Sequence, residues 1–212
     1  MNLPTKLNFI IKKPQVALPS LFLLGALLVL GVRFVTYAPE HVHYHANFAV
    51  FINGQQEKFK DPKYYQEVAI CMAGQGITIP QARAHLHDDK LGDIHIHDHA
   101  VTWNQLFNNL GWNIGSDYII TDTGTIYRED ATNKLNIYIN DQDYTSLTDL
   151  TNTVIKDGDR LLVSFGNTDK ATLQAETKSV PDTAAKLNAS KDPATCAGNE
   201  KVTLKERFKH LF

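Results

Sequence analysis

The feature that most constrains the fold is a strict alternation of side chains in HVHYHANFAVFI, residues 41 to 52. A period of two is the signature of a β-strand, because successive side chains of a strand point to opposite faces. Asn53-Gly54 follows and is a favoured hairpin turn, since both central residues need positive φ. The sequence therefore predicts a strand with an apolar face, Val42, Tyr44, Ala46, Phe48, Val50 and Ile52, and a polar face, His41, His43, His45 and Asn47.

Histidine is the unusual component of the composition. The chain of 212 residues contains nine histidines, and eight of them lie between His41 and His99. After the first group come two more, in HLH (85 to 87) and in HIHDH (95 to 99), separated by the turn-like segment DDKLGD. Because histidine again alternates with leucine or isoleucine, these two groups predict a second hairpin.

Histidines in this pattern favour a metal site. Alternate residues on one strand face lie about 6.6 to 6.8 Å apart. Two imidazoles at that spacing can lean toward one ion, because metal–nitrogen bonds are about 2.0 to 2.1 Å long. A second pair on a neighbouring strand would complete one site or form another, and imidazole suits zinc and copper equally well. The expected ligands are His43, His45, His85, His87, His95 and His97.

Further candidates lie at the edges of these groups. His41, His99 and Cys71 are additional expected ligands, and Asp88 and Asp98 are expected to accept a hydrogen bond from the second nitrogen of a ligating ring. Two alternatives stay open. The histidines could instead line a solvated sheet face, and Cys71 could be a buried thiol or form a disulfide with Cys196, because an exported domain permits one.

The N-terminus predicts a membrane anchor. An apolar run of 17 residues, 16 to 32, is at the short end for a spanning helix and continues past Arg33 to residue 38. Lys6, Lys12 and Lys13 precede it, which places residues 1 to 15 in the cytoplasm and the rest of the chain outside. A cleavable signal peptide ending near Ala38 is the alternative, and it exports the same domain.

The remaining chain predicts an α+β domain over residues 41 to 166. TWNQLFNNLG carries a capping-box pattern at Thr102 and Gln105, and predicts one helix ending at Gly111. Strand-like segments precede and follow it, which favours a mixed or antiparallel sheet with a single packed helix. Residues 167 to 200 contain few large apolar groups and predict a linker, whereas residues 201 to 212 predict an amphipathic helix, docked on the domain or resting on a membrane.

Charge and cysteine spacing exclude two functions. The formal net charge is −2, so no basic field exists to attract nucleic acid. The chain contains no C-x-x-C motif, on which thiol–disulfide exchange of the thioredoxin type depends.

Two resemblances add expectations. Residues 93 to 166, with the segment LTDL…IKDGDRLLVSFG, resemble the second half of a β-grasp (ubiquitin-like) domain, which implies that fold and no particular activity. The chain is similar to uncharacterised, membrane-anchored, exported His-rich proteins of bacteria and archaea, whose pattern is H-x-H-x-H…I-N-G followed by L-H-x-H-D…I-H. The matching residues are His41, His43, His45, Asn53, Gly54, Leu86, His87, Asp88, Ile94 and His95.

The function that these patterns favour is a membrane-tethered, extracytoplasmic module that binds zinc or copper for capture or handover. One alternative is a metal-dependent, hydrolase-like enzyme, with an open coordination position and Asp88 or Asp98 as the base. Asp93, His95 and His97 resemble the D-x-H-x-H of metal-dependent amidohydrolases, although that fold is a barrel of about 250 residues. Another alternative is a β-grasp interaction module without catalysis, in which the histidines respond to external pH.

Overall fold

The computed structural model describes residues 14–38, 42–65, 80–86, 90–144, 150, 152–190 and 202–211. The chain divides into two compact units. The first combines Met1–Glu40 with Glu200–Phe212, and the second is His41–Asn199.

The first unit contains the expected apolar helix, α2 (Pro14–Thr36). Its segment Leu18–Thr36 has a mean hydropathy of 2.2 and is long and apolar enough to cross a membrane. The side chains of Leu18–Thr36 are almost all exposed, as expected of a helix whose surroundings are not protein. The same unit contains the short helix α7 (Leu204–Lys209), which begins at a capping box made by Thr203 and Glu206.

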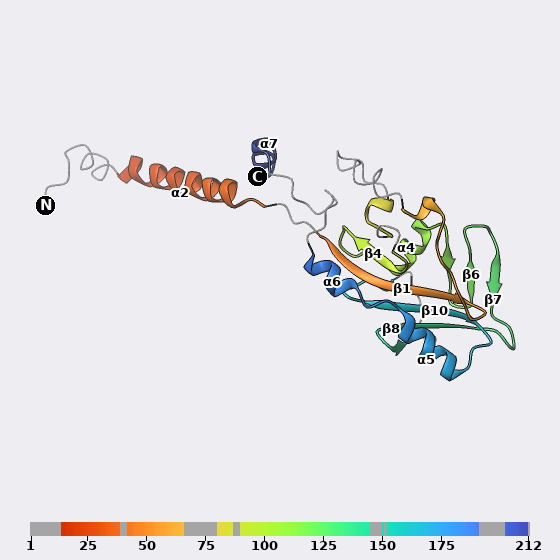
Figure 1. The fold of residues 1–212 in the computed structure, drawn as a ribbon. Helices are drawn as coiled ribbons and strands as arrows, with labels where there is room; N and C mark the ends of the chain where they lie inside the picture. The colour runs from red at the N-terminus through yellow and green to blue at the C-terminus, as the bar shows by residue number, and fades with distance from the viewer. Residues whose placement is uncertain are drawn as a thin grey trace. The chain divides into compact units, whose positions relative to one another are not determined.

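The second unit is built on a seven-stranded mixed sheet with the order β3-β4-β1-β10-β8-β9, in which β2 also pairs with β1 (Figure 1). The central pair, β1 and β10, is parallel. The other pairs are antiparallel. The strands are β1 (Tyr44–Ile52), β2 (Gln55–Gln56), β3 (Ala84–Leu86), β4 (Asp93–Ile96), β8 (Lys134–Ile139), β9 (Gln142–Asp143) and β10 (Arg160–Gly166). A three-stranded antiparallel sheet contains β5 (Asn113–Ile114), β6 (Tyr118–Ile120) and β7 (Ile126–Arg128).

Strand β1 confirms the alternation seen in the sequence. Ala46, Phe48 and Val50 are almost fully buried in the main core, and the turn residues Asn53 and Gly54 both have positive φ. The second expected hairpin is also present, since β3 pairs antiparallel with β4.

Helix α4 (Trp103–Asn109) covers the apolar face of the large sheet. The predicted capping box at Thr102 and Gln105 is present, and the side chains of Trp103, Leu106 and Phe107 are buried. Two turns of 3₁₀ helix, η1 (Pro62–Tyr65) and η3 (Pro80–Ala82), lie outside the strands. The main core therefore occupies the space between α4 and the apolar sheet face.

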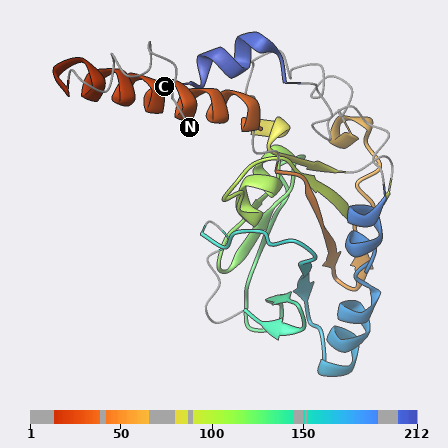
Figure 2. The same cartoon turned by 90° about the vertical axis from the view of Figure 1, so that its left-hand side faces the viewer.

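The opposite face of the large sheet carries two further helices, α5 (Lys170–Ser179) and α6 (Ala184–Ala189) (Figure 2). The expectation of a linker is therefore wrong for residues 167 to 190, as is that of one packed helix, and residues 191 to 200 lie outside the described residues. These helices need few large apolar groups, because polar contacts hold them. Arg160 donates to the carbonyls of Val180 and Pro181 at 2.7 and 3.1 Å, and only a small apolar cluster, Ala49, Phe51, Leu162 and Val180, packs beneath them.

Candidate metal centre

Strand register brings the histidines of three segments into one row. His45 on β1 lies directly opposite His95 on β4, and His95 lies opposite His85 on β3. Directly opposed residues project from the same face of a sheet. His43 precedes His45 by two residues and His97 follows His95 by two, so their side chains lie on the same face.

The five imidazoles are in mutual contact. Ring centroids are 4.5 Å apart for His45 and His95, and 5.3 Å apart for His85 and His95. The ring of His43 lies 5.1 Å from that of His97, and the ring of His85 lies 5.2 Å from that of His97. His45, His85 and His95 are at most 4 % exposed. We refer to His43, His45, His85, His95 and His97 as the histidine cluster.

Three members of the cluster could hold a metal ion. One ring nitrogen each of His43, His95 and His97 lies within 4.8 Å of the others, and Nε2 of His43 is 3.1 Å from Nδ1 of His95. Nitrogens that share a tetrahedral ion through bonds of about 2.05 Å lie about 3.3 Å apart. Modest rotation of the rings would therefore close this triad on one ion.

Hydrogen bonds fix the tautomers of the other two rings. Nδ1 of His45 lies 2.6 Å from Oδ1 of Asn188 on α6, and Nδ1 of His85 lies 3.2 Å from the carbonyl of Leu86. Both partners are acceptors, so each Nδ1 carries the proton and donates. The electron pair of each ring is then on Nε2, the atom left to bind a metal.

The electrostatic environment of His97 favours its neutral form. Burial, followed by the nearby rings of His85, His43 and His45, lowers the pKa of His97 to about 3. Nε2 of His97 is buried and makes no hydrogen bond within the part of the chain that the structure describes. His97 is therefore unprotonated at neutral pH, which is the form that binds a transition metal.

A buried polar network continues the row beyond the histidines. Asn47 lies opposite Asp93, and its amide Nδ2 donates to Asp93 Oδ1 at 2.7 Å. Oδ1 of Asn47 accepts from the backbone N–H groups of Thr183 and Ala184 at 3.1 and 3.0 Å. These bonds seat the start of α6 on the sheet, and so hold Asn188 against His45.

Sequence reasoning missed Asn188 as a contact of the histidines. It is separated from His45 by 143 positions and falls in the stretch expected to be a linker. Nothing in its local sequence marks it. Asp93, which the sequence placed in a turn-like segment and in the D-x-H-x-H pattern, is 3 % exposed and hydrogen-bonded to Asn47.

The remaining site predictions have different outcomes. His41, Cys71, His87 and Asp88 lie outside the described residues. His99 is exposed. Asp98 accepts hydrogen bonds from Nε of Arg83 and the backbone N–H of His99, both at 2.7 Å. A role for Asp98 beside a ligating ring stays a prediction.

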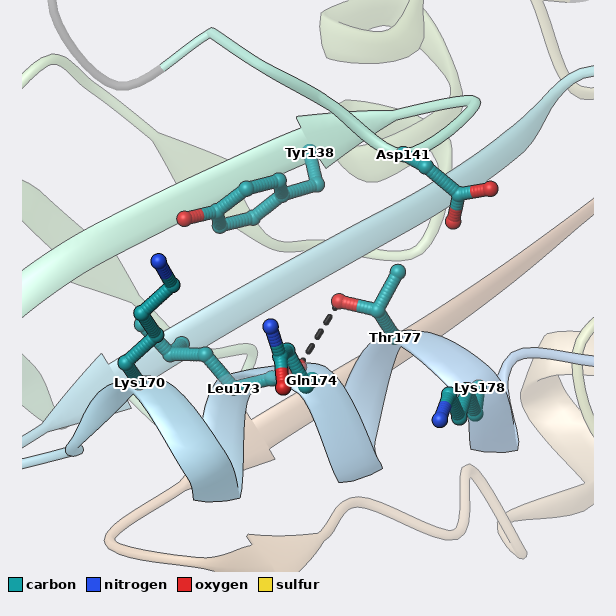
Figure 3. A pocket seen from close by; sticks show the side chains of 7 residues that line it. All are labelled: Tyr138, Asp141, Lys170, Leu173, Gln174, Thr177 and Lys178. Carbon is teal, nitrogen blue, oxygen red and sulfur yellow. Dashed lines mark hydrogen bonds between the residues drawn. The ribbon is translucent and has the colours of Figure 1, made fainter.

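A separate pocket of about 450 Å³ lies between α5 and β8 and shares no residue with the histidine cluster (Figure 3). The side chain of Lys170 extends toward the hydroxyl end of Tyr138. The residues that line this pocket are Tyr138, Asp141, Lys170, Leu173, Gln174, Thr177 and Lys178.

Comparison of the chain with protein-family models, with curated proteins and with solved structures finds no match. The function must therefore be argued from the histidine cluster itself.

Proposed function

We propose that this chain is a membrane-tethered module that binds zinc or copper outside the cytoplasm, for capture or handover of the ion. The observation that carries the proposal is the meeting of five imidazoles from three chain segments at one mostly buried place, with nitrogens of His43, His95 and His97 within 4.8 Å of one another. Neutral imidazole is a good ligand for both metals.

Binding is favoured over catalysis by the two additional rings. A catalytic zinc site keeps one coordination position for water or substrate. Here His45 and His85 lie beside the triad, and hydrogen bonds at Nδ1 put the electron pair of each ring on Nε2, so either ring could supply a fourth nitrogen. A site closed by four nitrogens would store or pass on an ion and would not activate water.

The tether is supported by α2, because its segment Leu18–Thr36 is long enough and apolar enough to span a membrane. Lys6, Lys12 and Lys13 precede the span, so the positive-inside rule places the N-terminus in the cytoplasm and the histidine cluster outside.

We further propose that the second unit is a β-grasp variant. The support is a parallel central pair, β1 and β10, flanked by antiparallel strands and covered by α4. This arrangement needs β1, so the unit would begin near residue 44 and not near residue 93, where the sequence resemblance begins.

The test is metal content. The full chain, purified in detergent, is loaded with Zn²⁺ or Cu⁺, dialysed and measured by elemental analysis. We expect about one ion per chain or more, and a loss of at least about tenfold in affinity for His95→Gln, because His95 contacts four other rings of the cluster.

The matched control is His99→Gln, which removes an exposed histidine close in sequence. Its metal content should equal that of the unmodified chain. Equal metal content in His95→Gln and the unmodified chain would refute the proposal. If the unmodified chain alone retains metal, competition with chelators of known affinity ranks zinc against copper.

A further inference from the structure

Helix α7 packs against the C-terminal end of α2. The ring of Phe208 lies 4.9 Å from that of Phe34, and the ring of His210 stacks on Tyr37 at 5.0 Å and 10°. These contacts join residues about 170 positions apart in the sequence, and they place α7 where the apolar span ends.

Arg207 fixes this placement. Its guanidinium donates to the backbone carbonyls of Phe34 and Val35 at 2.6 and 2.8 Å. The last carbonyls of a helix have no partner within the helix, so a cation that donates to them stabilises both the helix end and the contact. The Arg207 guanidinium therefore attaches α7 to the C-terminal end of α2, because it donates to carbonyls at that helix end.

The outer surface of α7 is amphipathic and uncovered. Leu204 and Phe208 are one turn apart and are 69 % and 63 % exposed. Lys205 and Lys209 are exposed on the same short helix. Two large exposed apolar groups are unfavourable in water. Beside two cations, they match the boundary between acyl chains and anionic headgroups.

We propose that α7 lies in the headgroup layer of the bilayer that α2 spans, with Leu204 and Phe208 at the acyl boundary and Lys205 and Lys209 among anionic headgroups. This inference rests on the membrane tether proposed above and is independent of the metal site. The chain then touches the membrane twice, before and after the unit His41–Asn199.

The test uses a fluorescent residue at the proposed depth. The full chain with Phe208→Trp is reconstituted into vesicles of phosphatidylcholine and phosphatidylglycerol that contain lipids with a quencher at a shallow or a deep acyl carbon. Native Trp103 and Trp112 are 0 % and 3 % exposed in the core of the other unit, so they give a constant background. We expect the introduced indole to be quenched at least about twofold more by the shallow label than by the deep one.

A second variant separates this inference from the tether. Phe22 is 81 % exposed within the span, so Phe22→Trp should be quenched most by the deep label. Failure of that result refutes the tether, and this inference with it. Quenching of Phe22→Trp without quenching of Phe208→Trp overturns the inference alone, whether α7 is then in water or covered by protein.

The charges give an independent readout. Lys205→Glu combined with Lys209→Glu should lower the shallow quenching of Phe208→Trp in vesicles that contain phosphatidylglycerol by at least about twofold, because attraction becomes repulsion. In vesicles of phosphatidylcholine alone the same change should have little effect. An equal effect in both vesicles would overturn the role given to anionic headgroups.

Discussion

At the scale of single residues, the histidine cluster depends on partners that are not histidines. Asn188 Oδ1 accepts from both Nδ1 and the backbone N–H of His45, at 2.6 and 3.0 Å. Its own amide nitrogen donates to Asp157. The amide is therefore oriented from both ends, and it determines which nitrogen of His45 carries the electron pair.

This orientation gives a prediction for Asn188→Ala. Without this acceptor, the His45 ring can rotate and can carry its proton on either nitrogen. The loss of such a supporting hydrogen bond lowers metal affinity about 10- to 100-fold. We expect a loss in this range in chelator competition. Lys186→Ala, an exposed change on the same helix, is the control and should leave the affinity unchanged. An unchanged affinity in Asn188→Ala would exclude His45 from the coordination sphere.

At the scale of elements, α5 buries a carboxyl group against the sheet. Glu176 is 5 % exposed, and a hydrogen bond with the side chain of Ser164 offsets only part of the cost of burying its carboxylate. Burial raises its pKa above the ordinary value. The helix is thus held by Arg160 and Val180 despite an unfavourable residue in its packed face.

The prediction for this element is that Glu176→Leu stabilises the protein. Replacing a buried carboxylate, whose burial cost is only partly offset, by an apolar side chain should raise the free energy of unfolding at pH 7 by about 1 to 3 kcal/mol. The gain should shrink as pH falls through the raised pKa, because native Glu176 then becomes neutral. Urea denaturation at pH 7 and pH 5 measures both effects. Gln174→Leu, exposed on the same helix, should change stability little.

At the scale of the whole molecule, the lowered pKa of His97 makes stability depend on pH. The folded protein keeps His97 neutral down to a pKa of about 3, whereas the unfolded chain protonates it near the ordinary histidine pKa of 6.5. Below 6.5 the unfolded state therefore binds the extra proton, so acid favours unfolding. The contribution has the opposite sign to that of Glu176.

We predict that the free energy of unfolding of the metal-free protein falls between pH 6.5 and pH 3, by up to about 1.4 kcal/mol per pH unit from His97. Denaturant titrations across this range measure the slope. His97→Gln should flatten it, while His99→Gln should not. A slope that is the same in His97→Gln as in the unmodified protein would show that other groups cause the acid sensitivity.

Local patterns in the sequence were sufficient for several elements. The alternation around β1, the Asn53-Gly54 turn, the capped helix α4 and the apolar helix α2 are all confirmed. Each depends on residues within a few positions of one another, through strand periodicity, positive φ or a helix cap. The same patterns predicted that the histidines share a sheet face.

Only the tertiary structure decided how distant segments meet. The register that aligns His45, His95 and His85, the parallel pairing of β1 with β10, and the docking of α6 through Asn47 and Asn188 join positions about 10 to 140 residues apart. No local periodicity encodes such pairings, because they are selected by the burial and hydrogen bonding of the complete sheet and its helices. The sequence by itself determined which residues of each strand lie on the same face of the sheet. The packing of the strands decided which five imidazoles converge.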